Sequence, residues 1–183
     1  MIISVAGAHS NVGKTTLITH ILRAIKGLGT VKYTKTAFYT SIIDDIEILR
    51  QADKDTALML EAGAEKVLWV QAPPNELEEL APLVIGQFDG LKAVIIEGNS
   101  PVEFFKPHLV IFLLSTPERI KSSAIKLIEK ADVIVVPGKG FDACKRPGVK
   151  VGVKVFVIDT VTGKGELDRL IGFIKEKIDE CED

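Results

Sequence analysis

The residues best suited to chemistry lie near the start of the chain, in the stretch AHSNVGKT from Ala8 to Thr15. This stretch fits the pattern G-x-x-x-x-G-K-[ST], whose backbone N–H groups surround phosphates, at every position except Ala8. A methyl group is tolerable there if the φ angle of Ala8 is negative. Gly13 lets the backbone approach a phosphate, Lys14 neutralises phosphate charge and Thr15 offers a hydroxyl to Mg²⁺. We therefore expect a nucleotide to contact the following residues: Ala8, His9, Ser10, Asn11, Val12, Gly13, Lys14, Thr15 and Thr16.

A carboxylate that could serve the same site is that of Glu97, directly after the apolar run AVII. In open α/β sheets, ligands bind beyond the carboxyl ends of strands, which is where a residue after such a run lies. Glu97 could hold Mg²⁺ through water or orient the water that attacks a phosphate. The alternative is a glutamate that faces solvent. Lys14 and Glu97 are therefore the predicted catalytic residues, and Thr15 and Glu97 are predicted metal ligands.

Further aspartates lie between the second and third apolar runs. Asp44 and Asp45 come soon after the second run, and either could reach the metal; we take Asp44 as the candidate ligand. For Asp53 two interpretations stay open: it approaches the nucleotide, or the stretch DKDT breaks the helix. In the second case, which we favour, Asp53 or Asp55 caps a new helix.

Apolar runs alternate with helical periodicity along the chain, and this alternation predicts the elements that position the candidate residues. Continuous Val, Ile and Leu runs indicate strands buried on both faces, as in a parallel sheet covered by helices. We expect strands over residues 2–6, 30–38, 66–72, 92–98, 108–114, 132–136 and 153–159, and helices over 14–26, 42–63, 76–88, 117–131 and 167–178. His20 falls opposite the apolar stripe of the first helix, so we expect it to be exposed. The prediction is a three-layer α/β fold, a mostly parallel sheet of about seven strands with helices on both faces, in a single domain over residues 1–183.

Composition narrows the classes of function. The net charge is −2, with 46% hydrophobic and 26% charged residues, so the overall charge does not favour nucleic acid. No apolar run approaches the roughly 20 residues of a membrane helix, and MIISVAG lacks the basic start of a signal peptide. Cys144 and Cys181 show no metal-binding spacing. We expect a cytoplasmic protein that binds neither nucleic acid nor a membrane, with a solvated loop around the basic residues from Lys139 to Lys154.

The stretches AHSNVGKTTLI and DKDTALMLEAGAEKVLWV, with the pair Glu97-Gly98, resemble the molybdopterin-guanine dinucleotide biosynthesis protein B family. That family begins with a G-[YF]-x-x-S-G-K-T-T-L-like loop and carries a G-K-D-S…A-G-A stretch before a strand. The resemblance implies a P-loop NTPase fold with GTP or ATP and Mg²⁺ as cofactors. It also implies slow hydrolysis and docking on a client protein of a metal-cofactor pathway.

The second half of the chain resembles the nickel-enzyme maturation GTPases of urease and hydrogenase. EGNSP is similar to their strand-end motif E-N-x-G-N…P, and VIDTVTGKGELDRLIGFI to their S-x-x-T-G-x-G-x-x-x-L stretch, which approaches the base. After DVIVV, however, Pro137-Gly138-Lys139-Gly140 replaces the base-reading N-K-x-D, which leaves both GTP and ATP open. We retain Lys139 as a nucleotide contact, while Asp142 is a disfavoured substitute for the missing aspartate. The cysteine and histidine motifs of these GTPases are absent, and His9 stands where ParA/MinD-type loops carry a lysine.

Three functions fit these residues. The first is a slow NTPase that assists the assembly of a metal cofactor, most like molybdopterin-guanine dinucleotide, and that can pair as a homodimer. The second is a small-molecule P-loop kinase or a dethiobiotin-synthetase-like ATP-dependent ligase, which needs a substrate pocket and fast phosphoryl transfer. The third is a binding module without turnover, against which Lys14, Thr15 and Glu97 all count.

Overall fold

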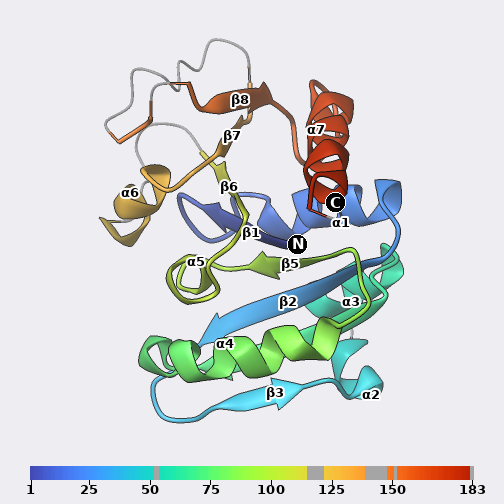
Figure 1. The fold of residues 1–183 in the computed structure, drawn as a ribbon, viewed down its shortest axis with the longest axis vertical. Coiled ribbons are helices and arrows are strands. Elements are labelled where there is room, and N and C mark those ends of the chain that lie inside the picture. Colours follow the sequence, from blue (N-terminus) through green and yellow to red (C-terminus); the bar gives the residue numbers. More distant parts are fainter. Residues whose placement is uncertain (52–53, 115–121, 139–147, 151, 182–183) are drawn as a thin grey trace.

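The structure, a computed structural model, describes residues 1–51, 54–114, 122–138, 148–150 and 152–181. Its centre is an eight-stranded sheet in the order β3-β4-β2-β5-β1-β6-β7-β8 (Figure 1). All neighbouring strands are parallel except β3 and β4, which are antiparallel. The strands are β1 (Ile2–Gly7), β2 (Leu28–Lys35), β3 (Ser41–Ile43), β4 (Lys66–Ala72), β5 (Ala93–Glu97), β6 (Leu109–Leu113), β7 (Val133–Val136) and β8 (Lys154–Val157). The predicted α/β class is confirmed.

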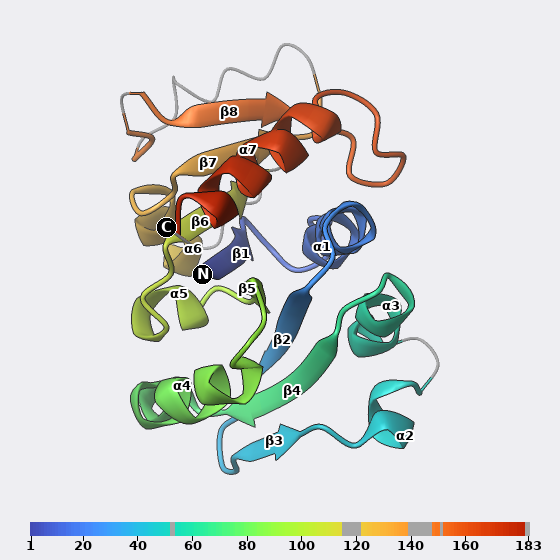
Figure 2. The same cartoon turned by 45° about the vertical axis from the view of Figure 1, so that its right-hand side comes forward.

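Helices cover both faces of the sheet, as the layered prediction requires (Figure 2). One face carries α1 (Lys14–Ala24), α2 (Ile46–Leu49), α3 (Asp55–Glu61) and α7 (Leu167–Asp179), and the other carries α4 (Leu77–Ile85), α5 (Pro101–Phe104) and α6 (Ser122–Ile128). Successive side chains of a strand point to opposite faces. Val5 accordingly packs with Leu17 of α1 in one apolar cluster, while Ala6 packs with Ala124 of α6 in another.

The central strands explain why the sequence shows continuous apolar runs. Every residue of β5 and of β6 is buried. A strand covered by helices on both faces has no side exposed to solvent. Its sequence is therefore a continuous apolar run and does not alternate between polar and apolar residues. The strand predicted over residues 66–72 is β4 with the same bounds.

The helix predicted over residues 42–63 is the main error in the sequence-based fold. Ser41–Ile43 instead form β3, which pairs with β4 at the edge of the sheet and was not among the predicted strands. Two short helices, α2 and α3, follow it. Asp45 begins the first of them, because its side chain accepts hydrogen bonds from backbone N–H groups of the first turn.

The other predicted helices are present, with altered ends. The helix expected over 76–88 is α4 with a 3-10 turn on each side of it. Of the helix expected over 117–131, residues 122–128 form α6, which ends three residues earlier than expected, and residues 115–121 lie outside the description. No helix among the described residues is long and apolar enough to cross a bilayer.

Sheet order decides where the candidate residues meet. β1 has β5 on one side and β6 on the other, and β2 lies directly beyond β5. These strands are parallel, so their carboxyl ends share one edge of the sheet. The loop after β1, the end of β2 and the end of β5 therefore converge there.

Candidate functional site

The loop after β1 leads directly into α1, as the phosphate-loop pattern requires. Gly13 is the N-cap of α1 and has a φ angle of 96°, in the left-handed region that favours glycine. A Cβ atom at Gly13 would also lie 2.3 Å from Thr160 Oγ1. The first backbone N–H groups of α1 have no partner within the helix, and the helix dipole places positive potential there. This end of α1 is suited to an anion.

Ala8 fits the loop in the way that the sequence predicts. Among the described residues other than glycine, only Asn11 and Lys106 have a positive φ angle, so Ala8 does not need to be glycine. Its side chain is buried, and its N–H donates to the Leu113 carbonyl at 2.9 Å. The need for glycine falls one residue earlier, at Gly7, where a Cβ would lie 2.5 Å from a methyl group of Val12.

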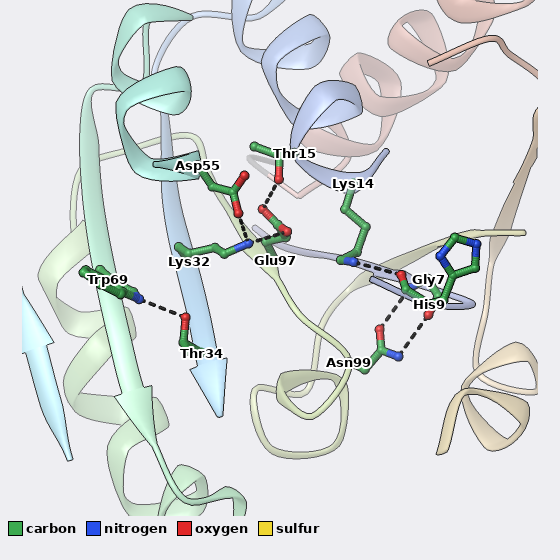
Figure 3. A network of polar contacts seen from close by, with 10 residues as sticks. All are labelled: Gly7, His9, Lys14, Thr15, Lys32, Thr34, Asp55, Trp69, Glu97 and Asn99. Carbon is green, nitrogen blue, oxygen red and sulfur yellow. Dashed lines mark hydrogen bonds and ion pairs between the residues drawn. The ribbon is translucent and has the colours of Figure 1, made fainter. Parts of the chain in front are cut away.

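Asn99 holds the start of the loop and was not predicted as a functional residue. Its Oδ1 accepts from the Gly7 N–H at 2.9 Å, and its Nδ2 donates to the Gly7 carbonyl at 3.0 Å (Figure 3). Both hydrogen bonds of one side-chain amide thus go to one backbone residue. The signal for it was present in the sequence, because Asn99 belongs to the EGN stretch after the apolar run of β5.

Four polar side chains from α1, β2, α3 and β5 meet beside the loop (Figure 3). Thr15 Oγ1 donates to Glu97 Oε2 at 2.9 Å, and Lys32 Nζ donates to Glu97 Oε1 at 2.7 Å. Lys32 also forms an ion pair with Asp55. Glu97 is only 3% exposed, so these hydrogen bonds offset the cost of burying its carboxylate. The alternative of a glutamate facing solvent is wrong.

The pKa values of Lys32 and Asp55 both shift toward the charged state. Burial by itself would lower the pKa of Lys32, but the carboxylates of Glu97 and Asp55 outweigh burial and raise that pKa above its ordinary value. Burial would raise the pKa of Asp55, yet Lys32, helped by Thr15 and Lys14, holds it below its ordinary value. Both groups are therefore charged at neutral pH.

A cavity of about 620 Å³ lies over the loop and this polar cluster. Most predicted loop contacts line it, namely His9, Ser10, Asn11, Gly13, Lys14, Thr15 and Thr16. Ala8 and Val12 do not, because their side chains turn into the apolar core. Lys14 Nζ donates to the His9 carbonyl at 3.4 Å, and Glu97 lines the floor with Lys32. Lys139 and Asp142 lie outside the described residues.

Asp44, the predicted metal ligand, does not reach this cavity. It is exposed and follows β3 at the edge of the sheet. Because β3 runs antiparallel to β4, its end points away from the edge where the parallel strands end. Asp45 is used as the cap of α2, so it does not reach the cavity either.

Asp55 is the aspartate that lines the cavity. The expected break of the helix near DKDT is confirmed, since α2 ends at Leu49 and α3 begins at Asp55. Asp55 does not cap α3, however, because its carboxylate pairs with Lys32. Asp53 lies outside the described residues.

The loop between β8 and α7 packs against residues 8–13, which we call the phosphate loop after its sequence pattern. His20 of α1 lies 3.0 Å, through Nε2, from the Thr160 carbonyl, and Thr160 Oγ1 faces Gly13. The prediction of an exposed His20 is wrong, because its ring is half-buried under this loop. Asp159 accepts hydrogen bonds from Val161 and Thr162 and so stabilises the turn.

A second cavity of about 220 Å³ adjoins the first one. The two share Lys32, Thr34 and Asp55 as lining residues. Trp69 Nε1 donates to Thr34 Oγ1 at 2.9 Å, and Lys54 Nζ lies 4.5 Å from the centre of the Trp69 ring. The second cavity therefore offers an aromatic surface beside the polar cluster.

The oxygen atoms of the polar cluster suit the Mg²⁺ that the resemblance implies. Mg²⁺ takes oxygen ligands and is commonly bound by one or two carboxylates together with substrate phosphates. Glu97, Asp55 and Thr15 provide two carboxylates and a hydroxyl around one point of the cavity. Within the described ranges no three His, Cys, Asp or Glu side chains gather as a metal cluster, so other ligands would come from phosphate and water.

Comparison with known proteins identifies the fold of this chain but does not assign the chain to a family. No protein-family model matches the chain, and no curated protein matches it. HypB from Helicobacter pylori, solved in complex with nickel, superimposes with a TM-score of 0.62 at 15% identity, over 98% of this chain and 87% of that one. MinD, a cell division protein of Aquifex aeolicus, matches with a TM-score of 0.46 at 13% identity, over 93% of this chain and 96% of that one. From the match to HypB, the chain has the P-loop NTPase fold.

Proposed function

We propose that this chain binds a nucleoside triphosphate, GTP or ATP, together with Mg²⁺ and hydrolyses it slowly. The observation that carries this proposal is the meeting of Lys14 and Thr15, at the start of α1, with the buried Glu97 beneath one large cavity. The P-loop NTPase fold supports it.

Each side chain then has a definite task. The N–H groups at the start of α1 bind phosphate oxygens, and Lys14 neutralises charge on the β- and γ-phosphates. Thr15, Glu97 and Asp55 would hold the metal, which would supply further positive charge to the same phosphates. Glu97 orients the attacking water. Asn99 positions the loop by holding Gly7.

Replacement of Lys14 tests the proposal. We expect Lys14→Ala to weaken binding of GTP and ATP by at least about 10-fold, because a charge-assisted hydrogen bond to phosphate contributes roughly 1.5–3 kcal/mol. Isothermal calorimetry with Mg²⁺ and each nucleotide measures the change and identifies the preferred base. Lys175→Ala, on the exposed face of α7, is the matched control and should bind as the unaltered chain does. Unchanged affinity in Lys14→Ala would overturn the phosphate-loop assignment.

We further propose that the chain assists a metal-cofactor pathway, most like molybdopterin-guanine dinucleotide assembly. Two stretches that carry the resemblance to that family, DKDT and Glu97-Gly98, supply Asp55 and Glu97 to one site. HypB is solved with nickel, which raises nickel-enzyme maturation as an alternative.

A client protein and a second copy of the chain are the partners that we propose. The loop after β2 begins beside Lys35, which lines the cavity, and carries Phe38 at 97% and Tyr39 at 55% exposure. Aromatic side chains are enriched at protein interfaces. Contact there would place a partner next to the nucleotide.

A small-molecule kinase or a dethiobiotin-synthetase-like ligase is the second candidate. The cavity beside Trp69 favours it, because it offers an acceptor a place next to the polar cluster. Turnover of the isolated chain, measured with and without client proteins and small-molecule acceptors, separates the two. Fast phosphorylation of a small molecule by the chain alone would defeat the accessory role.

A further inference from the structure

Lys32 lies between the two carboxylates to which we assign the metal. Its ammonium contacts Glu97 Oε1 at 2.7 Å and is paired with Asp55 on its other side (Figure 3). The register of the sheet enforces this position, because Lys32 of β2 stands directly opposite Glu97 of β5. Its side chain is 19% exposed and that of Glu97 is 4% exposed, so this contact is largely shielded from water.

Without a positive charge between them, the carboxylates of Glu97 and Asp55 would destabilise the folded chain. Two carboxylates near one another repel, and a buried carboxylate without a cation is unfavourable. Lys32 provides that charge when no metal is present. A divalent cation would seek the same oxygen atoms, since carboxylates are its preferred protein ligands. The ammonium and the metal therefore depend on the same partners.

We propose that Lys32 is an internal counter-ion that competes with the divalent metal for Glu97 and Asp55. In the metal-free chain the ammonium neutralises both carboxylates, and a metal binds only by displacing it. The displaced ammonium stays in the cavity, which lies over the phosphate loop, where bound phosphates offer it new partners. Metal alone should thus bind weakly, while metal and nucleotide should bind well together. This inference rests on the proposed function, which supplies the metal and the phosphates.

Binding of Mn²⁺ to the nucleotide-free chain tests the competition. Free Mn²⁺ is measured by electron paramagnetic resonance for the unaltered chain, Lys32→Met, Lys32→Gln and Lys32→Arg. We expect Lys32→Met and Lys32→Gln to bind Mn²⁺ at least about 10-fold more tightly than the unaltered chain, because a positive charge next to the ligands is removed. Lys32→Arg, which keeps the charge, should bind Mn²⁺ weakly. Lys175→Met, on α7, controls for the loss of a lysine elsewhere.

Two further measurements make the result decisive. Adding Glu97→Gln to Lys32→Met should abolish the gain in Mn²⁺ affinity, because the gain requires that carboxylate. Thermal unfolding should show that Lys32→Met is less stable than the unaltered chain without metal and gains more stability from Mn²⁺. Mn²⁺ affinity in Lys32→Met that is equal to or lower than that of the unaltered chain would overturn the proposal. If Lys32→Met and Lys32→Gln are both unfolded without metal, Mn²⁺ should restore their folding. Failure of Mn²⁺ to do so would also overturn the proposal.

Failure of this inference can be told apart from failure of the proposed function. If the unaltered chain binds Mg²⁺ with nucleotide but Lys32→Met gains no affinity for Mn²⁺, only the counter-ion role is lost. If Lys32→Met gains Mn²⁺ affinity while no variant binds nucleotide, the nucleotide proposal is lost and the competition stands.

Discussion

Glu97 is the residue on which the polar cluster depends most. It is nearly fully buried at the end of β5, and its two oxygens accept from different groups, the Thr15 hydroxyl and the Lys32 ammonium. A neutral side chain of the same shape would keep the packing but lose the charge. This separates a chemical role of the carboxylate from a structural one.

We expect Glu97→Gln to keep nucleotide binding and to lower the hydrolysis rate by about 10²-fold, the lower end of the usual contribution of a positioned acid or base. The Mg²⁺ concentration that gives half of the maximal hydrolysis rate should also rise, because a metal ligand is lost. Phosphate release measured over a Mg²⁺ series checks both effects, with calorimetry for binding. Glu61→Gln, at the exposed end of α3, is the control. Wild-type rate and Mg²⁺ dependence in Glu97→Gln would make Glu97 a structural residue.

Among the elements, the start of α1 and the loop after β8 fit together most closely. Gly13 has no room for a side chain because Thr160 lies against it, and His20 contacts the same loop about two turns further along α1. The phosphate loop thus packs against the β8–α7 loop along one side. A substitution in either loop should therefore disturb the conformation of the other.

A pair of glycine substitutions tests this packing. Gly13→Ala should destabilise the chain by at least about 1–2 kcal/mol, because alanine is strained at positive φ and its methyl group would collide with Thr160. Gly172→Ala, in α7, has nothing within 4 Å of the new methyl group and should stabilise the chain by about 0.5–1 kcal/mol. Urea unfolding of both variants measures the difference. Equal effects would show that the contact with Thr160 does not matter.

The topology of the whole molecule explains why the site lies where it does. From β1 the chain crosses to β2 on one side, and from β5 it passes β1 to reach β6 on the other. The crevice left at such a reversal is the usual ligand site of open α/β sheets. The apolar layers on both faces keep this sheet, and so the geometry of the site, in place.

Two phenylalanines show how unevenly the fold depends on its aromatic residues. Phe112 of β6 is fully buried, so Phe112→Ala should cost about 3–5 kcal/mol through lost burial and the cavity left behind. Phe38 is 97% exposed, so Phe38→Ala should change stability by less than about 0.5 kcal/mol. Unfolding in urea followed by circular dichroism compares them. A small effect in Phe112→Ala would contradict the assignment of β6 to the core.

Local patterns in the sequence predicted much of this structure. The strand, loop and amphipathic helix around Gly13 and Lys14 were predictable because their hydrophobic periodicity and turn chemistry depend on neighbouring residues. Glu97 was predictable because it ends an apolar run. The error over residues 42–63 arose where a short edge strand lacks a pattern of its own, since its stability comes from pairing with β4.

The α/β class, the phosphate-loop pattern and the carboxylate at the end of β5 could be read from local patterns along the chain. Three features needed the folded structure: Asp55 lines the cavity while Asp44 does not, Lys32 joins Asp55 to Glu97, and His20 lies under the β8–α7 loop. No local sequence pattern distinguishes Lys32, within the stretch GTVKYTK, from the other lysines of the chain. Its role follows from the register between β2 and β5, which brings together residues far apart in sequence, and register is a property of the assembled sheet.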